Sequence, residues 1–281
     1  MILEAALAQT KFMLKKKSAV CVFFILFIMV IINFISNVIY FQGRDVLEMY
    51  HPMRLLLLSQ NRVDFNASNT MLLIELYPIL VVCVAGFSFA KEYQIDMNVF
   101  MVSRLGNLRY IISKYIAAFL VTSIVFTLPF LMEIILNCIS FPLSAEGNLT
   151  NLSIYDDEYI ANVNNYLMTN VYIKNVYIYT FLGTLLFGIV SGLLGVFTVA
   201  FSTVVKIKYN VILFLPVFMI LNFTVIFSGK YLNQKPGISW YKYIFLFDDS
   251  VKNINFGIIG IILIIGFVLV TIGIKGRKDC L

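Results

Sequence analysis

Long apolar runs alternate with shorter polar stretches along the chain, and this pattern predicts helices that cross a membrane. A crossing helix needs about 20 apolar residues. Runs close to or above that length cover residues 18–40, 71–90, 115–136, 176–204, 211–228 and 254–274. We therefore expect an all-α integral membrane protein with six transmembrane helices, forming a single domain over residues 1–281.

The first polar stretch, residues 1–17, precedes an apolar run that is too long for a secretory signal and lacks a small-residue cleavage site. We interpret the run as a retained first span. Within 1–17, an apolar face predicts a short helix on the membrane surface. Its residues are Ile2, Leu3, Ala6 and Leu7.

Lys and Arg are denser in residues 1–17, 89–114, 205–210 and 275–281 than in the intervening loops. Positive charge favours the cytoplasmic side, so both termini are expected inside the cell. The composition agrees with a membrane protein, since 60% of residues are apolar, 13% are charged and the mean hydropathy is +0.91. The net charge of +6 forms no basic stripe with interleaved aromatics, which argues against nucleic-acid binding.

The chain carries no recognisable catalytic motif. It has no phosphate-binding P-loop, no GxSxG and a single histidine, so we expect no ATP site, no metal site and no enzymatic activity of its own. His51 is expected to be a solvated loop residue, and Leu55 to Leu58 a short interfacial helix. The cysteines are expected to be isolated thiols: Cys21, Cys83, Cys138 and Cys280.

Three features of the predicted spans have two interpretations each. Gly188 and Gly192 have the GxxxG spacing of close helix packing, either within the chain, which we favour, or between subunits. Glu75 and Glu133, each near a proline, either line an outward vestibule that suits cationic cargo or mark where their spans end. Residues 229–253 form either a pair of re-entrant helices or a plain interfacial loop; the Asn-rich stretch 142–175 is expected to be an outer loop.

The polar stretch from residue 89 to 114 separates the second and third runs and has helical periodicity, interrupted at Gly106. This break predicts two short helices on the cytoplasmic surface, which we interpret as the docking segment for a partner protein.

With six spans, both ends inside and this cytoplasmic segment, the chain resembles the permease subunit of type-2 ABC transporters. The family segment has the form E-x-x-x-G-T-L-x-x-L-L-x-x-P-x-S-R-x-x-x-x-x-x-K. Here Glu92 matches the acidic residue, and the closing positions match as well, although Asp96 replaces the glycine and the proline is absent. The matched positions are Met97, Asn98, Val99, Phe100 and Met101 for the coupling helix, Arg104 or Arg109 for the arginine, and Lys114 for the lysine.

The resemblance implies a homodimer or heterodimer of permease subunits in a bacterial plasma membrane, in contact with lipid. A separate cytoplasmic ATPase would bind ATP and magnesium and would grip residues 97–101, with Phe100 and Met101 as anchors. Many bacterial members of the family export lipids, glycans, drugs or antimicrobial peptides, and the acidic residues near the outer ends of the spans favour a cationic peptide or amphiphile. The alternatives are an ATP-independent secondary transporter, which needs ionisable residues at mid-membrane, a non-transporting anchor or sensor subunit, and a membrane-embedded enzyme.

Overall fold

The computed structural model describes residues 2–43, 51–59, 64–94, 97–142, 166–205, 210–231 and 254–276, and these are predominantly helical. For some helical residues only the backbone is described, namely 64–68, 87–94, 97–100, 210–211, 223–231, 254–257 and 275–276. The helices are α1 (Ile2–Leu14), α2 (Lys17–Phe41), the 3-10 turn η2 (Pro52–Leu55), α3 (Asp64–Gln94), α4 (Met97–Leu105), α5 (Asn107–Ser140), α7 (Thr169–Lys174), α8 (Val176–Val204), η3 (Asn210–Leu213), α9 (Phe214–Tyr231) and α11 (Ile254–Gly276).

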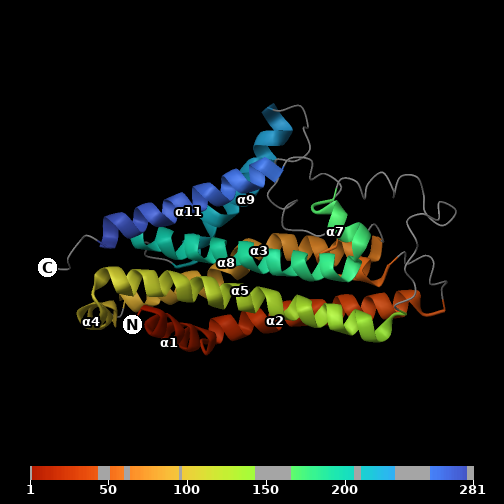
Figure 1. Cartoon of the computed structure of the whole chain (residues 1–281), viewed down its shortest axis with the longest axis horizontal. Helices are drawn as coiled ribbons and strands as arrows, with labels where there is room; N and C mark the ends of the chain where they lie inside the picture. The colour runs from red at the N-terminus through yellow and green to blue at the C-terminus, as the bar shows by residue number, and fades with distance from the viewer. Residues whose placement is uncertain are drawn as a thin grey trace.

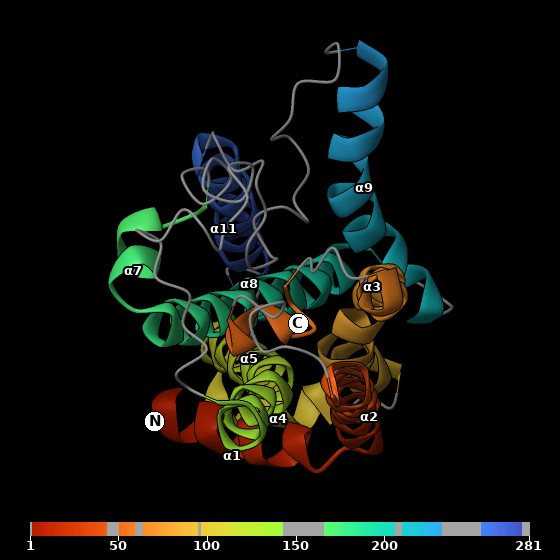
Figure 2. The same ribbon diagram turned by 90° about the vertical axis from the view of Figure 1, so that its right-hand side faces the viewer.

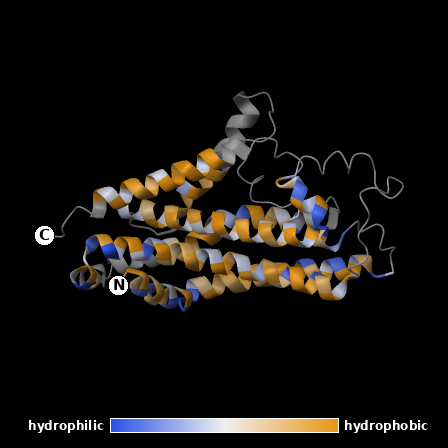
Figure 3. Cartoon of the chain, in the orientation of Figure 1, coloured by the Kyte–Doolittle hydropathy of each residue, from blue (hydrophilic) through white to orange (hydrophobic). Residues whose placement is uncertain are grey.

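Four helices in the described residues are long and apolar enough to cross a membrane: α2, α5, α8 and the part of α3 from Asn69 to Gly86. They run side by side as an elongated bundle (Figure 1). Apolar residues cover the length of the bundle, and hydrophilic residues gather at its two ends (Figure 3). We call the end with α1 and α4 the basic end, because Lys11, Lys15, Arg104 and Arg109 are exposed there, and the opposite end the far end.

Helices α5 and α8 pack closely because small residues line their contact. A Cβ atom added at Gly188 would come within 3.2 Å of the Ser123 backbone oxygen, and one added at Gly192 would lie 2.8 Å from the Phe119 ring. Both glycines are buried. The two glycines therefore lie in a helix contact within the chain.

The centre of the bundle is built on aromatic rings from α3, α5 and α8. Tyr77 lies 5.6 Å from both Phe126 and Phe187, measured between ring centroids, and Phe130 lies 5.2 Å from Phe187. The hydroxyl groups of Tyr77 and Ser191 share a hydrogen bond of 2.9 Å, so the polar tip of the ring is satisfied inside the core.

Helices α9 and α11 occupy the positions of the predicted fifth and sixth runs. Helix α11 packs on α8 and α5, whereas α9 touches α3 and α8 near its start and then stands away from the bundle (Figure 2). The possible re-entrant helices between them, within 229–253, fall mostly outside the described residues, as does most of the loop at 142–175.

The N-terminal segment is helical, as predicted, and forms α1. The residues that α1 buries show how it is held against the bundle. It lies crosswise beneath α5 (Figure 2) and buries Ala6, Gln9, Thr10 and Met13 at helical spacing. The Nε2 of Gln9 donates a hydrogen bond of 3.1 Å to Ser113 Oγ on α5. Leu3 is 69% exposed and Leu7 55%, so the expected apolar face, apart from Ala6, points away from the bundle.

Candidate functional site

Helix α4 is a separate nine-residue helix between two candidate spans at the basic end. Gly106 ends it with a φ of 78°, a left-handed conformation that glycine adopts without strain. The prediction of a second short helix after Gly106 is wrong, because residues 107–114 form the first turns of α5, which continues without interruption to Ser140. Movement of α4 would therefore act directly on α5, a helix that runs the length of the bundle.

The structure distributes the predicted docking residues unevenly. Arg104 and Arg109 are exposed, whereas Met101 is half-buried and packs against the core. Lys114 is 2% exposed, so it lies inside the bundle and not on a surface that a docking protein could touch. The side chains of Glu92 and of Met97, Asn98, Val99 and Phe100 lie outside the described residues, although their backbone is helical in α3 and α4.

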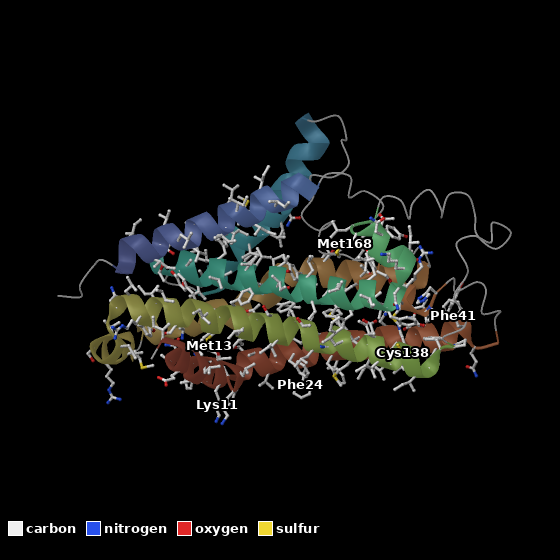
Figure 4. The ribbon with its side chains drawn as sticks, in the orientation of Figure 1. Lys11, Met13, Phe24, Phe41, Cys138 and Met168 are labelled. Atoms are coloured by element: carbon white, nitrogen blue, oxygen red, sulfur yellow. The ribbon has the colours of Figure 1, made fainter. Side chains whose placement is uncertain are left out.

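Around α4, positive charge continues onto α1. On α1, Lys11 is exposed and points away from the bundle, beside exposed apolar residues such as Leu7, whereas Met13 is buried (Figure 4). The Nζ of Lys16 lies 4.9 Å from the centroid of the Phe12 ring, a cation–π contact at the turn between α1 and α2. The basic end thus offers exposed cations on α1, α4 and the start of α5, around one short helix.

At the far end, residues 51–59 enter the bundle, which contradicts two sequence-based expectations. Leu55 to Leu58 are 1–3% exposed, so they are not an interfacial helix. Leu55 is the last residue of the 3-10 turn Pro52–Leu55, and the three leucines after it continue inside the bundle. His51 is 4% exposed and is therefore not solvated. We call residues 51–59 the re-entrant segment.

His51 begins the re-entrant segment and acts as its N-terminal cap. Its Nδ1 accepts a hydrogen bond of 3.1 Å from the backbone N–H of Met53, and its ring lies 5.1 Å from the ring of Tyr177 on α8. Burial, and secondarily the positive charge of Arg54, lower the pKa of His51 to about 4. The imidazole is therefore neutral at pH 7, the state in which Nδ1 can accept a hydrogen bond.

Amide side chains on α2 and α5 hold the backbone of the re-entrant segment. Asn33 and Asn37 donate to the carbonyl oxygen of Leu55 over 2.9 and 2.8 Å, and Asn137 donates to that of Pro52 over 3.3 Å. Non-helical backbone is tolerated at membrane depth only where protein groups satisfy its polar atoms. Here the three asparagines satisfy the backbone carbonyl groups that water would satisfy at a protein surface.

Glu133 is the centre of this arrangement. It is 0% exposed, and its Oε1 accepts hydrogen bonds from Asn33 Nδ2 over 2.7 Å and from the backbone N–H of Leu57 over 2.8 Å. Helix α5 continues to Ser140, so Glu133 does not mark the end of its helix. Glu75 is exposed on α3. The two acids therefore do not form a shared lining in this structure.

The sequence contained a local signal for this site that the run-by-run interpretation missed. Asn33 and Asn37 are four residues apart within one apolar run, and Glu133 and Asn137 are four residues apart at the end of another. Residues at this spacing share one helix face, and polar groups in a span are retained where they have partners. Two such pairs indicate two helices with polar stripes that face a common element.

Neither a metal centre nor an established relative accounts for these features. The described parts of the chain hold no group of three or more His, Cys, Asp or Glu side chains placed to bind a metal ion. Comparison with protein-family models, with curated proteins and with solved structures finds no match.

Proposed function

We propose that the chain is the membrane-spanning permease subunit of an ATP-driven exporter of the type-2 ABC kind, in a bacterial plasma membrane. Six helices cross the membrane with both termini inside, and two such subunits form the path for a peptide, a lipid or an amphiphilic drug. The chain hydrolyses no ATP itself. A separate cytoplasmic ATPase does so while bound to α4.

The single observation that carries this proposal is the placement of α4. It is a short helix of its own, joined to α3 and α5, and it packs against both of them. A protein that grips α4 would therefore push or pull two candidate spans together. The bundle core that connects them to α8 is closely packed, and packed cores transmit displacement instead of absorbing it.

The charge at the basic end also supports the orientation. Exposed Lys and Arg on α1, α4 and the start of α5 are those that the positive-inside rule places in the cytoplasm. An energy-supplying protein in the cytoplasm would find α4 on this side. The exposed side chain of Arg104 in the last turn of α4 is suited to an acidic surface on such a partner.

The experiment is co-purification of the tagged chain with an ATPase from membranes of the source cell, with ATP hydrolysis in the eluate as the readout. Phe100→Asp and Arg104→Glu in α4 should each reduce the ATPase activity that co-purifies. Lys174→Glu is the matched control, because Lys174 is also an exposed cation but belongs to α7, which packs at the start of α8. Equal recovery with all three variants would contradict docking on α4.

An ATP-independent transporter is the alternative that one observation favours, since Glu133 is an acid buried within a candidate span. However, the carboxyl group of Glu133 has a structural role, because it accepts hydrogen bonds from Asn33 and Leu57. Cargo accumulation in vesicles that contain the purified chain and a proton gradient, without ATPase, would establish this alternative.

A further inference from the structure

The re-entrant segment is enclosed by all four of the candidate spans. Its partners are Asn33 and Asn37 of α2, Glu133 and Asn137 of α5, Thr70 of α3 and Tyr177 of α8. From Met53 to Ser59, each residue except Arg54 is at most 3% exposed. The segment therefore fills the interior of the bundle at the far end.

A connection between two helices ordinarily runs over the protein surface, where water satisfies its backbone. Here the chain places polar side chains in candidate spans, at a cost in apolar surroundings, and directs four of them at one short segment. Because these polar side chains carry a free-energy cost, their arrangement indicates that natural selection maintains the buried position of the segment. We call Asn33, Asn37, Glu133 and Asn137 the latch.

The latch is only partly satisfied. Among the described residues, the Oε2 of Glu133, the Oδ1 of Asn33 and the Oδ1 of Asn137 have no hydrogen-bond partner, and all three atoms are buried. A permanent plug would gain by pairing each of these acceptors, because every buried polar atom left unpaired costs free energy. With these acceptors unpaired, the latch holds the re-entrant segment less tightly than it would if every one of its polar atoms were paired.

We propose that the re-entrant segment is a movable closure at the far end of the bundle, and that Asn33 and Glu133 are positioning residues that hold it closed. This inference rests on the proposed function, in which the far end faces outward and the closure opens during transport. Asn33 bridges the other two elements, since its Nδ2 donates both to Leu55 O of the segment and to Glu133 of α5.

The test measures how fast a membrane-impermeant maleimide labels Leu57→Cys in a chain whose four native cysteines are replaced by serine. Leu57 is 1% exposed, so labelling at rest should be slow. Adding Glu133→Ala or Asn33→Ala should raise the labelling rate by roughly tenfold, since one buried hydrogen bond corresponds to about that factor. Glu133→Gln keeps an acceptor for Asn33 and for the Leu57 N–H, so its labelling should stay near the resting rate.

A second labelled position separates local opening from general unfolding. Thr180→Cys lies in the first turns of α8 and is 0% exposed. The closure is contradicted if Glu133→Ala leaves labelling at position 57 unchanged, or if it raises labelling at positions 57 and 180 equally.

The same assay keeps the closure distinct from the proposed function. In membranes that also contain the ATPase, ATP should accelerate labelling at position 57 of the chain with an intact latch. If ATP has no effect while Glu133→Ala still accelerates labelling, the latch stands and the ATP-driven function is contradicted.

Discussion

Asn33 and Glu133 are one hundred positions apart in the sequence, and a buried hydrogen bond of 2.7 Å joins the Nδ2 of Asn33 to the Oε1 of Glu133. This bond ties α2 to α5 at the depth where the re-entrant segment enters. It also places two polar side chains within a largely apolar bundle, so their contribution to stability should be measurable.

Asn33→Ala should lower the free energy of unfolding by about 1–3 kcal/mol, because it removes buried hydrogen bonds to Glu133 and to Leu55 O. In a double-mutant cycle with Glu133→Ala, the two effects should fall short of additivity by about 1 kcal/mol. Unfolding of the purified protein in mixed micelles would measure both. Asn222→Ala is the control, since among the described residues Asn222 donates to Phe218 O within its own helix, α9, and its effect should be small. Strict additivity would show that the two side chains act independently.

Gly192→Ala should destabilise the contact between α5 and α8. The added Cβ would overlap Ser123 Oγ and lie 2.8 Å from the Phe119 ring, closer than atoms can approach. Overpacking of this kind costs about 1–3 kcal/mol. Thermal unfolding, followed by size-exclusion chromatography of a fluorescent fusion, gives the measurement.

The matched control for this substitution is Gly266→Ala in α11, where a Cβ would meet nothing within 4 Å. It should leave the melting temperature unchanged or slightly higher, since alanine favours the helix. An equal loss at both positions would contradict the assigned packing role of Gly192.

His51 should make the protein less stable as the pH falls from about 6.5 towards 4. The pKa of His51 in the folded chain is about 4, below its ordinary value of 6.5. In that interval the unfolded chain binds a proton that the folded chain does not, so acid favours unfolding. The effect reaches up to about 3 kcal/mol near pH 4.

His51→Asn tests this assignment, because asparagine also caps a turn through a side-chain oxygen but does not titrate. Its stability should fall less steeply than that of the parent chain between pH 6.5 and 5. His51 is the single histidine of the sequence, so no other imidazole contributes to the difference. Parallel stability curves for the two proteins would refute a buried neutral His51.

The lengths of the apolar runs predicted most of the helical framework. Spans expected at 18–40 and 176–204 differ by at most one residue at either end from α2 and α8. The docking segment was also predicted to be helical, with a break at Gly106. This break was predictable because the positive φ of Gly106, 78°, is a property of the local sequence. Helix α3 begins earlier than expected, at Asp64, because helical hydrogen bonding continues into the polar residues before the apolar run.

The burial of the re-entrant segment could not be predicted from the pattern of residues 51–59 alone. Leu55 to Leu58 are too few to cross a membrane, and an interfacial helix is what such a run forms when nothing else holds it. What holds it here comes from distant parts of the chain: Glu133 lies 76 positions from Leu57, and Asn137 lies 85 from Pro52. Tertiary hydrogen bonds of this kind determine whether His51 is solvated or buried, and a single sequence does not specify them.

The side of the membrane on which each end of α5 lies is a direct test of the proposed orientation. Leu108 is exposed in its first turn, near α4, and Ser140 is exposed at its last residue. Each is replaced by cysteine in the cysteine-free chain and treated with an impermeant maleimide, in intact cells and in inverted membrane vesicles. We expect Leu108→Cys to be labelled only in the inverted vesicles and Ser140→Cys only in intact cells. Labelling of Leu108→Cys from outside the cell would contradict the proposed orientation, because α4 could then reach no cytoplasmic ATPase.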